Sequence, residues 1–129
     1  KAKESAGETE RILFGARSVG ELKVLTANIN EADANKLRQM GDLLRDKAPD
    51  VVGVLACVSG EKITFLAVCG KEAVAKGIKA GDIIKTVTAI CGGKGGGKPD
   101  SAMGGGSDVS KLDNALACVD DFVSQKLGL

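Results

Sequence analysis

The stretch best suited to binding chemistry is residues 91–108, which read CGGKGGGKPDSAMGGGSD. Eight of the fifteen residues from Gly92 to Gly106 are glycine, with two lysines and a proline among them. Glycine loses more conformational entropy on folding than any other residue, so such a cluster indicates a use for bare backbone. Successive backbone N–H groups can form a nest for an anion, and lysine side chains add positive charge. The candidates for contact with phosphate or ribose are Lys94, Gly95, Gly96, Gly97, Lys98 and Ser101.

A structural interpretation of the same stretch has equal weight from the residues alone. Its glycines would let two helices approach while the lysines stay solvated, and loops of this length are usually functional or disordered. A nucleotide-hydrolase loop is rejected because that pattern needs Ser or Thr after GK, and here Pro99 follows Lys98. Asp100 is expected to cap or brace the loop, because a carboxylate repels phosphate.

The remaining side chains argue against catalysis and against a metal site. The sequence has no histidine, which is the usual general base and the commonest metal ligand. The four cysteines are Cys57, Cys69, Cys91 and Cys118, and none forms the CxxC pair typical of zinc sites. Most lie in apolar stretches, as reduced core thiols of a cytoplasmic protein would. We therefore expect no catalytic residue, no metal ligand and no cofactor in this chain.

Length and composition indicate one folded domain. The chain has 129 residues, 43% of them hydrophobic, and a formal net charge of +1. A chain of this length can bury a real core, and the small net charge means that a nucleic-acid site must be a local patch. With three phenylalanines and no tryptophan or tyrosine, base-stacking modules are poorly supported. No signal peptide is visible, and the longest apolar run, VVGVLACV, is too short to cross a membrane.

Hydrophobic spacing predicts the elements that position the glycine-rich stretch. Apolar runs, alternating or continuous, predict strands near residues 10–17, 21–28, 51–58 and 63–69. Helical spacing predicts helices after Asn30, at 71–77, at 79–91, and after Ser107 or Asp108. The last helix has an apolar stripe at Val109, Leu112, Leu116, Val119, Val123 and Leu127, with Gly128 suited to end it.

The element order is ββαββα-loop-α, with the glycine-rich loop at residues 92–106. It predicts an α/β (α+β) fold in which a mixed or antiparallel sheet of about four strands packs with helices. Residues 10–129 are expected to form this single domain. Residues 1–9 are expected to be the end of an upstream helical segment or a linker.

The glycine-rich stretch and its flanks resemble a known family. Residues 78–117, which contain IKAGDIIKTVTAICGGKGGGKPDSAMGGGSD, closely resemble the C-terminal globular domain of bacterial alanyl-tRNA synthetases, a domain of the DHH-associated class. The matching features are a small residue at Ala80, the run GGKGGG, a basic residue and Pro-Asp, a second glycine cluster, and Ala115–Leu116 in the following helix. The upstream part is compatible in pattern, so the resemblance spans most of the chain.

The resemblance implies a tRNA-binding domain that is not itself catalytic. The family's whole enzyme ligates alanine to tRNA with ATP, and a separate domain hydrolyses mischarged tRNA. The C-terminal domain binds the outer elbow of the alanine-specific tRNA and links charging to editing. The implied partners are this tRNA, the aminoacylation and editing domains of the same chain, and a second copy through an adjoining helical segment. The ATP and zinc sites would lie upstream, and the enzyme would be cytoplasmic.

The chemistry of individual residues assigns them roles at such an interface. Lys94 and Lys98 would contact phosphate, Gly95, Gly96 and Gly97 would permit close backbone approach, and Ser101 would donate a hydrogen bond. Further candidates for a basic surface are Lys71, Lys76, Lys79, Lys85, Arg11 and Arg17, although each alone is an ordinary charged surface residue.

Two other functions stay open. One is the substrate-binding domain of a DHH-type phosphoesterase, whose triple glycine is usually followed by His, where this chain has Lys98. The other is a dimerisation or protein-interaction module, which the near-zero net charge permits.

Overall fold

The computed structural model describes residues 17–20, 22–29 and 34–128. The strands are β1 (Arg17–Val19), β2 (Leu22–Asn28), β3 (Val51–Ser59), β4 (Lys62–Cys69), β5 (Lys94–Gly97) and β6 (Ser101–Gly106). The helices are α2 (Ala34–Lys47), α3 (Lys71–Ala75), α4 (Ala80–Ile90), a 3-10 turn at Val109–Lys111, and α5 (Leu112–Leu127). The predictions for residues 1–9, for nearly all of 10–17 and for the Asn30 cap fall outside the described residues.

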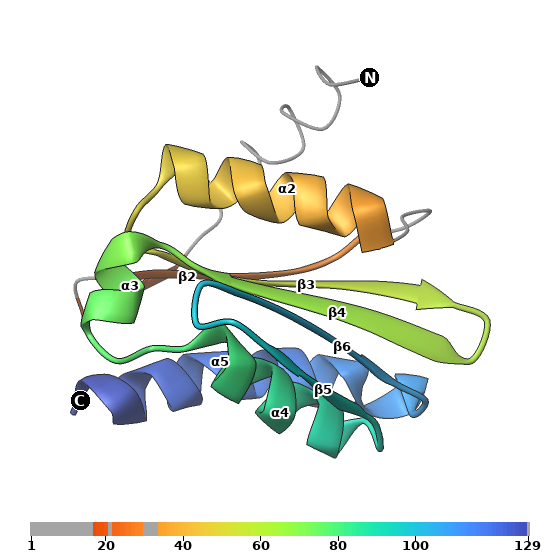
Figure 1. Cartoon of the computed structure of the whole chain (residues 1–129). Coiled ribbons are helices and arrows are strands. Elements are labelled where there is room, and N and C mark those ends of the chain that lie inside the picture. The colour runs from red at the N-terminus through yellow and green to blue at the C-terminus, as the bar shows by residue number, and fades with distance from the viewer. Residues whose placement is uncertain (1–16, 21, 30–33, 129) are drawn as a thin grey trace.

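The strands form one mixed sheet in the order β1-β2-β3-β4-β6-β5. Strands β2 and β3 are parallel, and every other neighbouring pair is antiparallel. Helix α2 makes the crossover that a parallel pair requires. It covers one face of the sheet, whereas α4 and α5 lie against the other (Figure 1). This confirms the predicted mixed sheet packed with helices.

Strand β3 shows why a continuous apolar run suits this architecture. Its side chains alternate between two cores, because successive residues of a strand point to opposite faces. Val52 and Val54 belong to the core that α4 and α5 complete. Val51 and Leu55 belong to the core beneath α2. Both faces of the strand are covered, so neither requires polar residues.

The expected number of about four strands is wrong, because the segment expected as a loop at residues 92–106 supplies β5 and β6. Glycine is depleted from strands, so its abundance here pointed to a loop. In the fold, β6 pairs with the edge of β4 along six residues, and this long-range pairing decides the conformation.

The last helix also differs from its predicted stripe. Val109 lies in the 3-10 turn before α5 and is 37% exposed, because it precedes the α-helical register. The fully buried positions of α5 are Leu112, Ala115, Val119 and Val123. Gly128 ends the helix in the left-handed conformation with φ of 77°, as predicted. Among the described residues, none of the helices combines the length and apolarity that a bilayer span requires.

Candidate nucleic-acid interface

The glycine-rich stretch forms a β-hairpin at one edge of the sheet. β5 pairs with β6 from Lys94 opposite Gly105 to Gly97 opposite Ala102. The connecting turn closes with a hydrogen bond from the Lys98 N–H to the Ser101 carbonyl at 3.0 Å. β5 is the last strand of the sheet, so its outer edge carries backbone groups that no further strand of the described chain covers.

Backbone hydrogen bonds hold the 98–101 turn in place from two sides. The Ala80 N–H, at the start of α4, donates to the Pro99 carbonyl at 2.8 Å. The Cys69 N–H, at the end of β4, donates to the Asp100 carbonyl at 3.0 Å. The turn is therefore fixed to the helix and to the strand that flank it.

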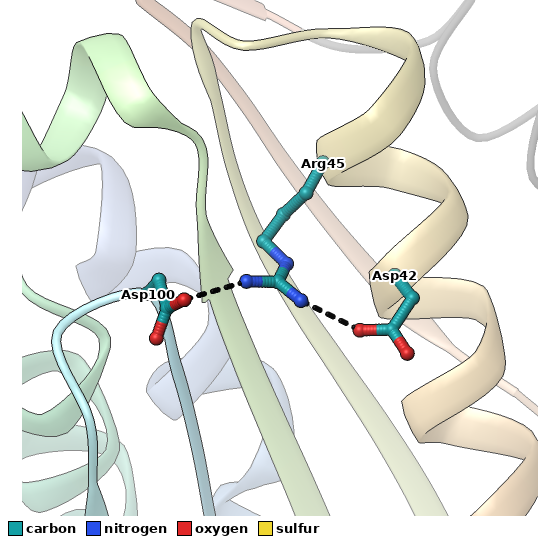
Figure 2. Close-up of polar contacts among 3 residues, drawn as sticks. All are labelled: Asp42, Arg45 and Asp100. Atoms are coloured by element: carbon teal, nitrogen blue, oxygen red, sulfur yellow. Dashed lines mark hydrogen bonds and ion pairs between the residues drawn. The ribbon is translucent and has the colours of Figure 1, made fainter.

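An ion pair adds a third support to the turn. The Asp100 carboxylate accepts a hydrogen bond at 2.8 Å from Nη1 of Arg45, which lies on α2 (Figure 2). The other end of the same guanidinium lies 2.7 Å from Asp42 on α2. This contact confirms that Asp100 braces the turn. Arg45 was not identified from sequence, because its partner is 55 residues away.

One face of the hairpin needs glycine so that α4 can pack on it. A methyl group on Gly95 would lie 2.5 Å from Ile84 Cγ2, and one on Gly104 would lie 2.7 Å from Thr88 Cγ2. Gly97 shares this face, and its carbonyl would lie 3.1 Å from a methyl group on Gly81. Real Cβ atoms almost never lie within 3.0 Å of such a neighbour, so Gly95 and Gly104 are required for the packing of α4, and the contact at Gly81 is tight.

Gly96 lies on the opposite face of the hairpin, where a side chain would not meet α4. Its cross-strand partner is Met103, which packs against the core beneath α2. A methyl group on Gly96 would meet no atom within 4 Å, and its backbone does not adopt the left-handed conformation. Neither packing nor backbone geometry within the described residues therefore calls for glycine at this position.

The open face of the hairpin brings together part of the predicted set. Because side chains alternate along a strand, Lys94, Gly96 and Ser101 share the face of Met103. Lys98 lies in the turn, and Gly95 and Gly97 face α4 instead. The structure thus separates six candidates into an open face, a turn and a packed face.

Lys94 and Lys98 lie at the two ends of β5, about 13 Å apart along an extended strand. Both are exposed, and neither forms an ion pair with any residue that the structure describes. Each therefore keeps its charge available to an external anion.

The other predicted cations are divided between neighbouring surfaces. Lys79 and Lys85 line a hollow of about 100 Å³ beside Gly97 and Pro99, next to the turn. Lys71 lines a separate cleft on the α2 side of the turn. Lys76 interacts elsewhere in the chain. Arg11 and the side chain of Arg17 fall outside the described part of the structure.

Lys62 is a cation of the open face that the sequence did not reveal. Thr64 of β4 and Lys94 of β5 both align with Gly105 of β6, and Lys62 lies two residues before Thr64 on the same face. Lys62 and Thr64 line a hollow of about 410 Å³ with Gly105. Finding Lys62 required the register of β6 on β4, which no local pattern supplies.

The chemistry available here is binding. Burial, with a smaller contribution from Asp100, raises the pKa of the Cys69 thiol to about 12, so this thiol stays protonated and is a poor nucleophile. The described residues contain no group of three His, Cys, Asp or Glu side chains placed to hold a metal ion. What the hairpin offers is bare backbone flanked by lysines.

Comparisons with known proteins identify the family of this fold. A model of the DHHA1 domain matches residues 21–125. The alanine–tRNA ligase of Methylobacillus flagellatus is 43% identical over 127 residues, which are 98% of this chain and 14% of that protein. The chain therefore spans about one seventh of the length of the curated relatives that it matches.

Solved structures show the same fold. The crystal structure of the C-Ala domain from Aquifex aeolicus alanyl-tRNA synthetase matches with a TM-score of 0.78 and 28% identity, covering 84% of this chain and 97% of that one. A pGpG-specific phosphodiesterase from Vibrio cholerae matches with a TM-score of 0.54 and 10% identity, covering 97% of this chain and 40% of that one, which indicates a shared fold alone. The chain belongs to the DHHA1 domain family and resembles the C-terminal domain of alanyl-tRNA synthetases.

Proposed function

We propose that this chain is the tRNA-binding C-terminal domain of an alanine–tRNA ligase and performs no catalysis itself. It would bind the elbow of the alanine-specific tRNA and thereby link the aminoacylation and editing domains of the same cytoplasmic enzyme. ATP and zinc would be bound by those other domains. The similarity to alanine–tRNA ligases along 98% of the chain supports the parent enzyme.

The observation that carries tRNA binding is the open face of the hairpin. Lys94 and Lys98 flank β5 without an ion-pair partner among the described residues, and at Gly96 between them the space that a side chain would occupy is open. A sugar–phosphate backbone lying along this edge would meet charge at both ends and no side chain in the middle. Such contacts recognise shape and phosphate rather than base sequence, as is usual for structured RNA.

The experiment is a salt-titrated binding assay of the chain with intact tRNA, beside the Lys94→Ala/Lys98→Ala double variant. Loss of two phosphate contacts is expected to reduce the slope of log K against log salt by about 1.5 and to weaken binding. A Lys126→Ala variant is the matched control, because Lys126 lies on α5 over the Phe122 ring, away from the hairpin. Circular dichroism verifies that the variants fold.

Equal slopes for the double variant and the wild type would place RNA contact elsewhere. Absence of tRNA binding by the wild type, with a dimer in sedimentation, would favour the dimerisation or protein-interaction module instead.

A further inference from the structure

A cleft of about 580 Å³ opens beside the 98–101 turn and is separate from the open face of the hairpin. Its walls come from the last turns of α2, from α3 and from the turn itself. The volume is within the range of sites that bind small molecules or single rings. The residues that bear on its chemistry are Asp42, Arg45, Asp46, Lys71, Val74 and Pro99.

Arg45 in this cleft is not arranged to bind phosphate. A guanidinium binds phosphate through its planar fork of N–H groups, often with two parallel hydrogen bonds. In Arg45 the two terminal nitrogens already contact carboxylates, Nη1 at 2.8 Å from Asp100 and Nη2 at 2.7 Å from Asp42 (Figure 2), and Nε is buried away from solvent with no hydrogen-bond partner among the described residues. The side chain remains 29% exposed while held at both ends. A guanidinium fixed by its edges can still offer its flat face, on which planar rings stack.

The charges in the cleft also disfavour phosphate. Asp42, Asp46 and Asp100 outnumber Arg45 and Lys71 by one. Asp46 is exposed and has no hydrogen-bond or ion-pair partner among the described residues. A carboxylate of this kind accepts hydrogen bonds from the exocyclic amino group of a base. Val74 and Pro99 add apolar wall surface, and Lys98 directly precedes Pro99 in the chain.

We propose that this cleft takes one unstacked nucleobase of the bound RNA, stacked on the face of Arg45 with its amino group toward Asp46. Lys71 and Lys98 at the rim would contact the flanking phosphates. The inference rests on the RNA-binding function proposed above and adds to it a site for a base. Because uracil lacks an exocyclic amino group, the cleft favours cytosine, adenine or guanine over uracil.

The test is a two-dimensional NMR titration of the isotope-labelled chain with three probes: cytidine monophosphate, uridine monophosphate and ribose 5-phosphate. The two nucleotides differ by an amino group against a carbonyl, and the sugar phosphate lacks the base. Cytidine monophosphate is expected to shift the amides of Gly70, Lys71 and Val74, with uridine monophosphate about fivefold weaker. Ribose 5-phosphate, which lacks the base, is expected to leave the Gly70 and Val74 amides unchanged and to shift at most the Lys71 amide at the rim.

Two variants assign the contacts. Arg45→Met keeps a long apolar side chain but removes the planar face, and it is expected to lower cytidine monophosphate affinity about tenfold. Asp46→Asn is expected to abolish the preference for cytidine over uridine, and its position is exposed, so the fold is retained. Equal shifts with all three probes would show a phosphate site and overturn the proposal. No shift at the cleft up to about 10 mM nucleotide, which detects a Kd near 1 mM, would also overturn it.

The same tRNA assay separates this inference from the proposed function. If the wild type binds tRNA but nucleotides leave the cleft unchanged, the base site is wrong and tRNA binding stands. If the wild type fails to bind tRNA, the proposed function fails whatever the nucleotides do.

Discussion

The two faces of the β5–β6 hairpin carry the same residue type in different surroundings. On the face that meets α4, an added methyl group at Gly95 would lie 2.5 Å from Ile84 Cγ2. On the open face, one at the adjacent Gly96 would meet nothing within 4 Å. A run of three glycines in the sequence therefore contains positions that the fold requires and one that it does not. Because the fold does not require glycine at position 96, the glycine there is better explained by a binding partner that contacts this face.

The largest effect that would test this comparison is loss of stability at Gly95. Gly95→Ala is expected to reduce the free energy of unfolding by about 2–3 kcal/mol, because its methyl group meets α4 and the backbone of β6. Urea unfolding monitored by circular dichroism measures this change, with Gly96→Ala as the matched control. If both alanine variants were equally stable, the distinction between the faces would be lost.

A substitution at Gly96 tests whether the open face serves RNA binding rather than stability. Gly96→Val is expected to change the free energy of unfolding by no more than about 0.5 kcal/mol, because valine suits a strand and the site is open. A side chain there holds the RNA away from the backbone, so tRNA affinity is expected to fall about tenfold. The measurement pairs urea unfolding with the tRNA titration. Unchanged affinity in a stable variant would remove Gly96 from the interface.

Stability is also expected to depend on pH through Cys69, which is buried at the end of β4 and whose N–H binds the braced turn. Its pKa is raised to about 12 in the folded chain, above the value near 9 expected after unfolding. Above pH 9 the unfolded thiol loses its proton while the folded thiol keeps it, so the unfolded state gains and stability falls between pH 9 and 12. From pH 9 to 10 the loss attributable to Cys69 is expected to be about 1 kcal/mol.

Cys69→Ala provides the control for this pH effect. The variant is expected to lose stability less steeply above pH 9 in parallel urea titrations, since other titrating groups are common to both chains. Identical slopes would indicate that the thiol ionises readily and that the packed end of the hairpin opens to solvent.

The smallest expected effect is at the ion pair that supports the turn. Asp100→Asn is expected to cost about 0.5 kcal/mol, because the Asp100 side chain is 51% exposed and water screens the pair. Hydrogen exchange at the Lys98 amide measures the local consequence, with Asp42→Asn as a control that leaves the contact to the turn intact. Faster exchange of the Lys98 amide in the Asp100 variant, with little change in the free energy of unfolding, would identify the ion pair as a local brace. Faster exchange in the Asp42 variant alone would contradict that role.

Local patterns were sufficient for much of this fold. Helical spacing predicted α2, α4 and most of α5, and the apolar runs predicted β3 and β4, because each pattern matches the burial of its own segment. Lys94 and Lys98 were singled out from composition and resemblance, and their role in tRNA binding stays a prediction. Their exposure at the two ends of β5 was visible only in the folded chain.

The sequence by itself determined the layered α/β fold, the position of the glycine-rich segment and the absence of histidine. The tertiary structure decided that this segment forms a hairpin and which of its glycines pack against α4. It also decided that Lys62 and Arg45 lie near the hairpin. The physical reason is that glycine carries no side-chain preference of its own. The edge of β4 and the side chains of α4 impose the conformation, and an arginine from α2 adds a weaker support to the turn; each is distant along the chain.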